Sequence, residues 1–228
     1  GDISPQSYLI SKNASAKHKV ILTGDGGDEL FFGYNEYSRF LYLKSIKSYI
    51  LFKKTLSNKK HLERYNKILS PDIEQYAFQK GGLNKFQKEE FKLKFSIPKD
   101  YDDFWFFRKF YNQDLDVKRR IEYLDFKTFL PEHALTRVDR NSMLFGLECR
   151  VPFLSNSMIE LAFSIDPSLK FANKNLKYIT RKILEGFSSY DYAFSKKVGF
   201  SINSSLRRKF YGNWRVNENI SMIEKYIQ

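Results

Sequence analysis

The stretch VILTGDGGDELFFGY at residues 20–34 decides the fold class. Its beginning, Val20 to Thr23, is rich in β-branched residues and is typical of a buried parallel strand. The glycines between Gly24 and Gly27 interrupt that strand. From Asp28 apolar residues recur every three or four positions, which predicts one helix through Leu41. A loop between a strand and a helix is the usual ligand site of an open α/β sheet.

The loop at the centre of this stretch is acidic, with Asp25, Asp28 and Glu29 in five consecutive residues. Its spacing matches neither a dinucleotide fingerprint nor a Walker A loop. Carboxylates repel a bare phosphate, so a hard cation must lie between them. Mg²⁺ is held by one or two carboxylates together with phosphate oxygens. The alternative is structural: Asp28 caps the helix and Glu29 complements its dipole.

The rest of the chain favours helices. A single strand cannot form a sheet, so we expect its partners to be cryptic in this sequence or to lie outside it. Residues 42–115 are rich in lysine and aromatic residues, and their helical patches are divided by Ser70-Pro71, Gly81-Gly82 and Pro98. The aromatic run from Asp103 to Phe107 is expected to pack between helices rather than to stack on nucleic-acid bases. Further helices are expected around residues 8–17, before Pro131, from Leu135 past Leu147 to about Val151, at 157–163, and at 176–184 with Gly186 as the stop.

Composition excludes several classes of protein. The 228 residues carry a net charge of +13 with 42% hydrophobic and 17% aromatic residues, which excludes a wholly disordered chain. No apolar run approaches the roughly 20 residues of a membrane-spanning helix. The single cysteine, Cys149, indicates a reducing compartment, so we expect a cytoplasmic protein. Three scattered histidines argue against zinc, and the lysine-rich charge argues against nucleic-acid recognition, which favours arginine.

Four ordered motifs carry a resemblance to a known family. They are Thr23 to Tyr34, then LTRVDRNSM at 135–143 with LECRVPFL at 147–154, then KYITRK at 177–182 and KKVGFS at 196–201. Together they resemble the C-terminal synthetase domain of glutamine-dependent asparagine synthetases, in the ATP pyrophosphatase superfamily. The resemblance covers most of the chain outside about residues 42–115.

The resemblance implies a fold and a reaction. The expected fold is mostly α with a short parallel β remnant, as the C-terminal portion of an α/β adenine-nucleotide-hydrolase-like (PP-loop) synthetase domain, with segments 1–41, 42–115 and 116–228. In this family the aspartate carboxylate attacks the α-phosphate of Mg-ATP to give an aspartyl adenylate and pyrophosphate. Ammonia, released from glutamine by a separate N-terminal glutaminase domain, then displaces AMP.

The resemblance also implies residue roles. Asp25 stands where an acid handles protons during ammonia attack, Asp28 where an acid supports Mg²⁺ and pyrophosphate, and Lys177 where a lysine stabilises phosphate charge. The matching positions expected to contact ATP are Gly24, Gly26, Gly27, Arg181 and Lys196. Those expected to contact substrate or support the site are Glu29, Asp139, Arg140, Glu148 and Arg150.

Departures from the family pattern keep other interpretations open. The ATP-gripping S-G-G-x-D-S loop and the cysteine nucleophile of the glutaminase are absent from these residues, so we expect a partial domain that is inactive alone. Ser155 stands where the family usually has aspartate, which leaves room for an amidotransferase acting on another carboxylate, of a sugar or a peptide. The third hypothesis is a non-enzymatic basic module that binds nucleic acid or another anion. A homodimer is left open, since an uncovered apolar surface drives self-association.

Overall fold

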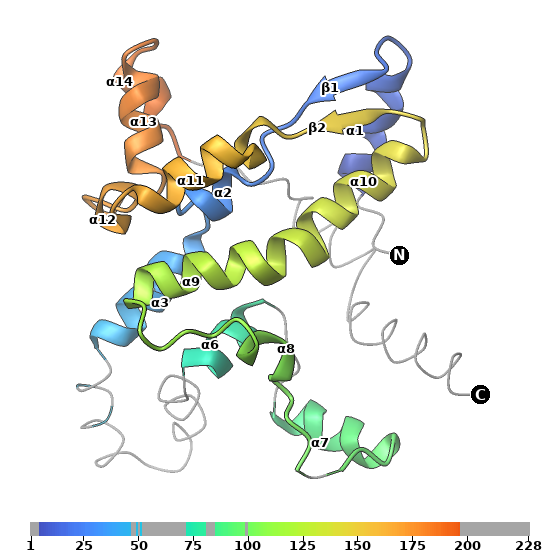
Figure 1. The fold of residues 1–228 in the computed structure, drawn as a ribbon, viewed down its shortest axis with the longest axis vertical. Helices are drawn as coiled ribbons and strands as arrows, with labels where there is room; N and C mark the ends of the chain where they lie inside the picture. Colours follow the sequence, from blue (N-terminus) through green and yellow to red (C-terminus); the bar gives the residue numbers. More distant parts are fainter. Residues whose placement is uncertain are drawn as a thin grey trace. The chain divides into compact units, whose positions relative to one another are not determined.

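The computed structural model describes residues 5–46, 49, 51, 72–80, 85–98 and 100–196, and these residues are mostly helical with one small sheet (Figure 1). The expected fold class is confirmed. Residues 1–82 and 98–194 form one compact unit, and residues 83–97 and 195–228 form a second, whose described helix is α7 (Lys85–Lys94). The helices of the first unit are α1 (Pro5–Ser15), α2 (Gly27–Leu30), α3 (Asn35–Ser45), α6 (Asp72–Gln79), α8 (Trp105–Arg108), α9 (Val117–Leu124), the π-helix η1 (Asp125–Leu135), α10 (Thr136–Met143), the 3-10 helix η2 (Pro152–Leu154), α11 (Asn156–Ser164), α12 (Pro167–Lys170), α13 (Tyr178–Glu185) and α14 (Tyr190–Ala193).

The sheet pairs two strands that lie far apart in the sequence. Strand β1 (Val20–Leu22) runs parallel to β2 (Glu148–Arg150), with Ile21 opposite Cys149 (Figure 1). The predicted strand is therefore confirmed, and its cryptic partner is β2. The prediction that β1 is buried is wrong, because Val20 is 40% and Leu22 73% exposed. Side chains alternate between the faces of a strand, and helices α1 and α10 pack together beside β2. Alternate residues of both strands therefore remain in solvent.

The expectation of helix up to Val151 is also wrong, because residues 148–150 form β2. Gly146 ends the preceding helical turn with a φ of 61°, in the left-handed region. The Leu147 N–H donates to the Ser142 carbonyl at 3.1 Å, the closing bond of a Schellman-type helix end. A helix that ends here releases Glu148 to pair with β1.

Helix α9, η1 and α10 form one continuous helical segment (Figure 1). The sequence predicts that Pro131 separates two helices, and that prediction is wrong. In an α-helix the proline ring clashes with the carbonyl four residues earlier. The wider π-helical turn across residues 125–135 accommodates Pro131. The Thr136 hydroxyl donates to the Pro131 carbonyl at 2.8 Å.

The helix predicted from Asp28 to Leu41 is broken into α2 and α3. Phe32, between them, has a φ of 58°. The break directs two adjacent rings into different clusters. Phe31 packs with Leu30 and Ala162, whereas Phe32 packs with a cluster from α3, α6 and α9. A continuous helix could not bury both rings in this way, so tertiary packing overrides the helical periodicity.

Other predictions hold. Helices α1, α11 and α13 form near the expected residues, and Gly186 ends α13. Of the aromatic run at 103–107, Phe107 packs on Tyr76 with ring centroids 5.4 Å apart, as expected. Trp105 is 56% exposed, which the expectation of interhelical packing did not anticipate. Among the described helices, none is long and apolar enough to cross a membrane.

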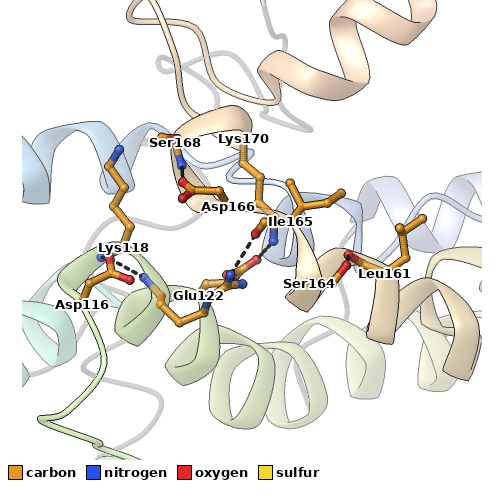
Figure 2. Close-up of polar contacts among 10 residues, drawn as sticks. Asp116, Lys118, Glu122, Leu161, Ser164, Ile165, Asp166, Ser168 and Lys170 are labelled. Carbon is orange, nitrogen blue, oxygen red and sulfur yellow. Dashed lines mark hydrogen bonds and ion pairs between the residues drawn. The ribbon is translucent and has the colours of Figure 1, made fainter.

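A buried ion cluster joins α9 to α12 (Figure 2). The side chains of Glu122 and Lys170 form an ion pair with no exposed area on either. Arg119 donates to the other Glu122 oxygen at 3.0 Å and to the Ile165 carbonyl at 2.8 Å. Burial raises the pKa of Glu122 and lowers that of Lys170, since it penalises both charges. This ion cluster fixes the α11–α12 connection against α9.

Candidate active site

The acidic loop packs against the segment that follows β2. The Thr23 N–H donates to the Arg150 carbonyl at 2.9 Å, which extends the β1–β2 pairing into the loop. Gly26 has a φ of 83°, and a Cβ there would lie 2.4 Å from a Leu154 methyl carbon. Glycine at this position therefore satisfies both the turn and the close approach. The first two sequence motifs thus meet at the loop.

Asp28 forms an ion pair with Lys177. The Lys177 Nζ lies 2.6 Å from Asp28 Oδ1, and the two side chains are 32% and 26% exposed. Lys177 has a φ of 54° at the start of α13, and its N–H donates to the Phe32 carbonyl at 3.3 Å. The third motif, some 150 residues downstream in the sequence, therefore contacts the loop and the turn that follows it.

Gly33 leaves the room for this ion pair. A Cβ on Gly33 would lie 1.9 Å from Asp28 Oδ1 and 2.5 Å from the Lys177 Cε. Both distances are far inside van der Waals contact. The break between α2 and α3 therefore serves the site directly, because it places a glycine backbone against the Asp28–Lys177 pair.

Glu29, the next residue of α2, is more buried than Asp28. Its side chain is buried, and the Tyr34 hydroxyl donates to its Oε1 at 2.5 Å. Burial raises the pKa of Glu29 above its ordinary value. Burial and the neighbouring Glu29 raise the pKa of Tyr34 as well, so Tyr34 remains a hydrogen-bond donor. Glu29 thus anchors α2 to the core beneath the loop.

Asp25 is partly buried at the turn before α2. Among the residues that the structure describes, none bonds to its carboxylate. The neighbouring Gly24 is exposed, and a Cβ there would meet open space. The turn therefore presents one partly buried carboxylate with no partner among the described residues, three residues before Asp28.

Two further residues predicted to contact ATP are Arg181 and Lys196. Arg181 donates to the carbonyls of Leu176 at 2.8 Å and Ala193 at 2.9 Å, which ties α13 to α14. Its predicted contact with ATP stays a prediction. Lys196 belongs to the second unit, and the rest of its motif, residues 197–201, lies outside the described residues.

Apart from the buried Glu29, the predicted substrate or scaffold residues lie on exposed surfaces. Asp139 and Arg140 are exposed on α10. Glu148 and Arg150 form an exposed ion pair on β2 at 2.8 Å. The sheet register connects this pair to the loop through Val20 and Leu22.

The loop fits magnesium in a phosphate complex better than a metal bound by protein alone. Within the described part of the chain, no three His, Cys, Asp or Glu side chains cluster to hold a metal. Mg²⁺ needs one or two carboxylates when substrate phosphates supply further oxygens. Asp28, held in a glycine-lined space with a cation beside it, meets that requirement.

Sequence reasoning missed a charged pair under the loop. Lys80, at the end of α6, donates to the buried Asp125 at 2.7 Å. The signal was available in part, because Asp125 directly follows the apolar face of Ile121 and Leu124. An acid there predicts a buried partner, but its identity depends on a contact 45 residues away.

The site and fold together define a class of protein. A parallel strand leads into an acidic, glycine-rich loop, and a lysine from a later helix pairs with the loop, which lies where α/β proteins usually place a ligand site. The model of the asparagine synthase family matches residues 1–218, so the chain belongs to the asparagine synthase family.

Curated relatives support this assignment. The chain is 27% identical over 244 residues to asparagine synthetase (glutamine-hydrolysing) 1 of Bacillus subtilis, covering 97% of this chain and 35% of that protein. A putative asparagine synthetase (glutamine-hydrolysing) of Mycobacterium bovis is 26% identical over 209 residues, covering 86% of this chain and 31% of the relative. The chain thus spans about a third of the length of these relatives. No solved structure matches the chain significantly.

Proposed function

We propose that this chain supplies part of the synthetase site of an ATP-dependent, glutamine-hydrolysing asparagine synthetase. The observation that carries the proposal is the Asp28–Lys177 pair, which joins two family motifs at 2.6 Å beside the acidic loop. The proposed substrates are aspartate and ATP, with ammonia derived from glutamine in a glutaminase domain that these residues do not include. Cys149 as the single cysteine agrees with a cytoplasmic setting.

The proposed roles follow from charge and exposure. Asp28 would hold Mg²⁺, which supplies positive charge to the phosphates when bound. Lys177 would turn its ammonium from Asp28 to a phosphate oxygen, where it stabilises the negative charge that develops as pyrophosphate leaves. Since the pair is partly exposed, this exchange of partners costs little desolvation.

Asp25 would act on the second half of the reaction. Ammonia that attacks an acyl adenylate becomes positively charged and must lose a proton. A carboxylate in the open turn, close in sequence to the phosphate-binding acid, is suited to accept that proton. The glycines around Asp25 would let the loop backbone approach the nucleotide.

The test uses the protein expressed from its complete reading frame. With ATP, Mg²⁺, aspartate and glutamine we expect asparagine, AMP and pyrophosphate. Asp25→Asn and Asp28→Asn should each reduce kcat/KM by at least about 100-fold, the lower range for an acid–base or electrostatic group. Asp102→Asn, which removes an exposed partner of Arg108, is the matched control and should leave kcat/KM within about twofold.

The outcomes separate the hypotheses. AMP release without asparagine, restored by another carboxylate substrate, would assign the family reaction to a different acceptor. Ser155, exposed at the start of α11 where the family usually has aspartate, motivates that alternative. Full activity of both loop variants would contradict the proposed site.

A further inference from the structure

A buried cluster of one lysine, one carboxylate and four aromatic rings lies under the acidic loop. We call it the Lys80 cluster, made up of Lys80, Asp125, Tyr34, Tyr37, Tyr76 and Phe129. Asp125 is fully buried and accepts hydrogen bonds from Lys80 at 2.7 Å, from the Tyr76 hydroxyl at 2.5 Å and from the Tyr37 hydroxyl. A buried carboxylate with three donors is fixed in position.

The aromatic rings form a cage around the ammonium group. The Lys80 Nζ lies 4.1 Å from the Phe129 ring centroid and 4.8 Å from that of Tyr34. It lies 5.7 Å from the centroids of Tyr37 and Tyr76. Cation–π attraction is strongest when the cation is desolvated, and the Lys80 side chain is only 12% exposed. The cage therefore holds the ammonium in one place.

Tyr34 connects this cluster to the loop. Its ring faces Lys80, and its hydroxyl donates to Glu29 at 2.5 Å. Glu29 directly follows Asp28 in α2, and Tyr34 directly follows Gly33, the glycine that makes room for the Asp28–Lys177 pair. Lys80 and its cage thus support both sides of the break between α2 and α3.

We propose that Lys80 is a positioning residue for the acidic loop: it holds Asp125 and the Tyr34 ring so that Tyr34 and Glu29 fix α2, and with it Asp28, in the orientation that a magnesium–phosphate ligand needs. This inference rests on the proposed function. It also gives a role to residues 72–80, which the family motifs do not cover. Lys80 acts through Tyr34 and touches no substrate.

The test compares Lys80→Met with Lys80→Arg in the protein expressed from its complete reading frame, with magnesium pyrophosphate as the probe. Calorimetry well below the unfolding temperature should show affinity at least about 10-fold weaker for Lys80→Met. Lys80→Arg keeps a cation that also binds aromatic faces, so it should restore affinity to within about threefold. Lys109→Met is the matched control, since Lys109 lies 5.5 Å from the centroid of one ring, Phe110, and is exposed.

Two further measurements keep the inference decisive. Tyr34→Phe keeps the ring beside Lys80 but removes the bond to Glu29, so it should weaken pyrophosphate binding like Lys80→Met, and it serves if Lys80→Met does not fold. Amide NMR should show shifted signals for Gly26, Gly27 and Gly33 in both variants and not in Lys109→Met.

Unchanged affinity together with unchanged loop amides in folded variants would overturn the inference. If the unaltered chain does not bind magnesium pyrophosphate, the proposed function loses its support, and the loop amides alone decide whether Lys80 positions the loop.

Discussion

Two lysine–carboxylate pairs in the same compact unit have the same chemistry and different surroundings. Glu122 and Lys170 pair with each other (Figure 2) and have no exposed side-chain area, and Arg119 donates to the second Glu122 oxygen. Asp28 and Lys177 are 26% and 32% exposed beside a glycine-lined loop. Charges that are buried together cannot change partners without a large desolvation cost. We therefore expect the first pair to stabilise the fold, whereas the second pair is the one that we propose to exchange partners with a ligand.

The largest expected effect comes from breaking the buried pair. Lys170→Met should lower the free energy of unfolding by about 3–5 kcal/mol, because Glu122 loses its closest counter-charge in the core. The double variant Glu122→Leu/Lys170→Met should recover most of that loss, since replacing both charges by apolar groups removes the desolvation penalty. Urea unfolding measures both. A single variant that loses less than about 1 kcal/mol would place this pair with ordinary surface ion pairs.

A smaller effect on the free energy of unfolding is expected from Gly33→Ala, which crowds the partly exposed Asp28–Lys177 pair. The added methyl group would lie 1.9 Å from Asp28 Oδ1, so the carboxylate and Lys177 must move apart. Crowding of this kind costs about 1–3 kcal/mol in unfolding free energy. Gly24→Ala is the stability control, because its Cβ meets open space. Equal unfolding midpoints for the two alanine variants would show that Gly33 is not needed for the pair.

The pH dependence of the unfolding free energy should further distinguish the buried Glu122–Lys170 pair from the partly exposed Asp28–Lys177 pair. Burial raises the pKa of Glu122 above its ordinary value of 4.5, although Lys170 and Arg119 oppose the shift. The native state therefore binds more protons than the unfolded state above pH 4.5, and stability falls as pH rises through the native pKa. One proton sets a limit of about 1.4 kcal/mol per pH unit. Lys170, whose pKa is lowered, acts in the opposite direction at higher pH.

Urea unfolding of the native chain and of the Glu122→Leu/Lys170→Met variant over this range measures that contribution. The unfolding free energy of the double variant minus that of the native chain should rise as pH increases above 4.5. A value that falls as pH increases through the same range would contradict the direction given for Glu122.

The sequence predicted the elements whose formation depends on neighbouring residues. Glycines and β-branched residues located β1 and the loop, and apolar runs located α11 and α13, with Gly186 as the stop of α13. Strand β2 was missed because Glu148 to Arg150 carry no strand pattern and pair only through a long-range contact with β1. The break at Phe32 was missed because Phe31 and Phe32 pack in different clusters. Neither choice is encoded in neighbouring residues.

The candidate site also contains some features that the sequence predicted and others that depend on long-range packing. The family motifs predicted that Asp28 and Lys177 belong to one site, and the structure brings them together. Gly33 was part of a quoted motif, but its role depends on the placement of α13. Lys80 and Asp125 were not predicted, since their partner choice requires the packing of α6 against the helix that contains residues 117–143.

The most direct test of the central claim is a calorimetric titration of the protein expressed from its complete reading frame with magnesium pyrophosphate, repeated for Lys177→Met and for Lys174→Met. Lys174 is the matched control, because it is an exposed lysine that also has a positive φ, 62° against 54° for Lys177. We predict saturable binding by the native chain, affinity at least about 10-fold weaker for Lys177→Met, and native affinity for Lys174→Met. Lys177→Met should change the unfolding free energy by about 1 kcal/mol or less. Equal affinity for all three proteins would contradict the assignment of the Asp28–Lys177 pair to phosphate binding.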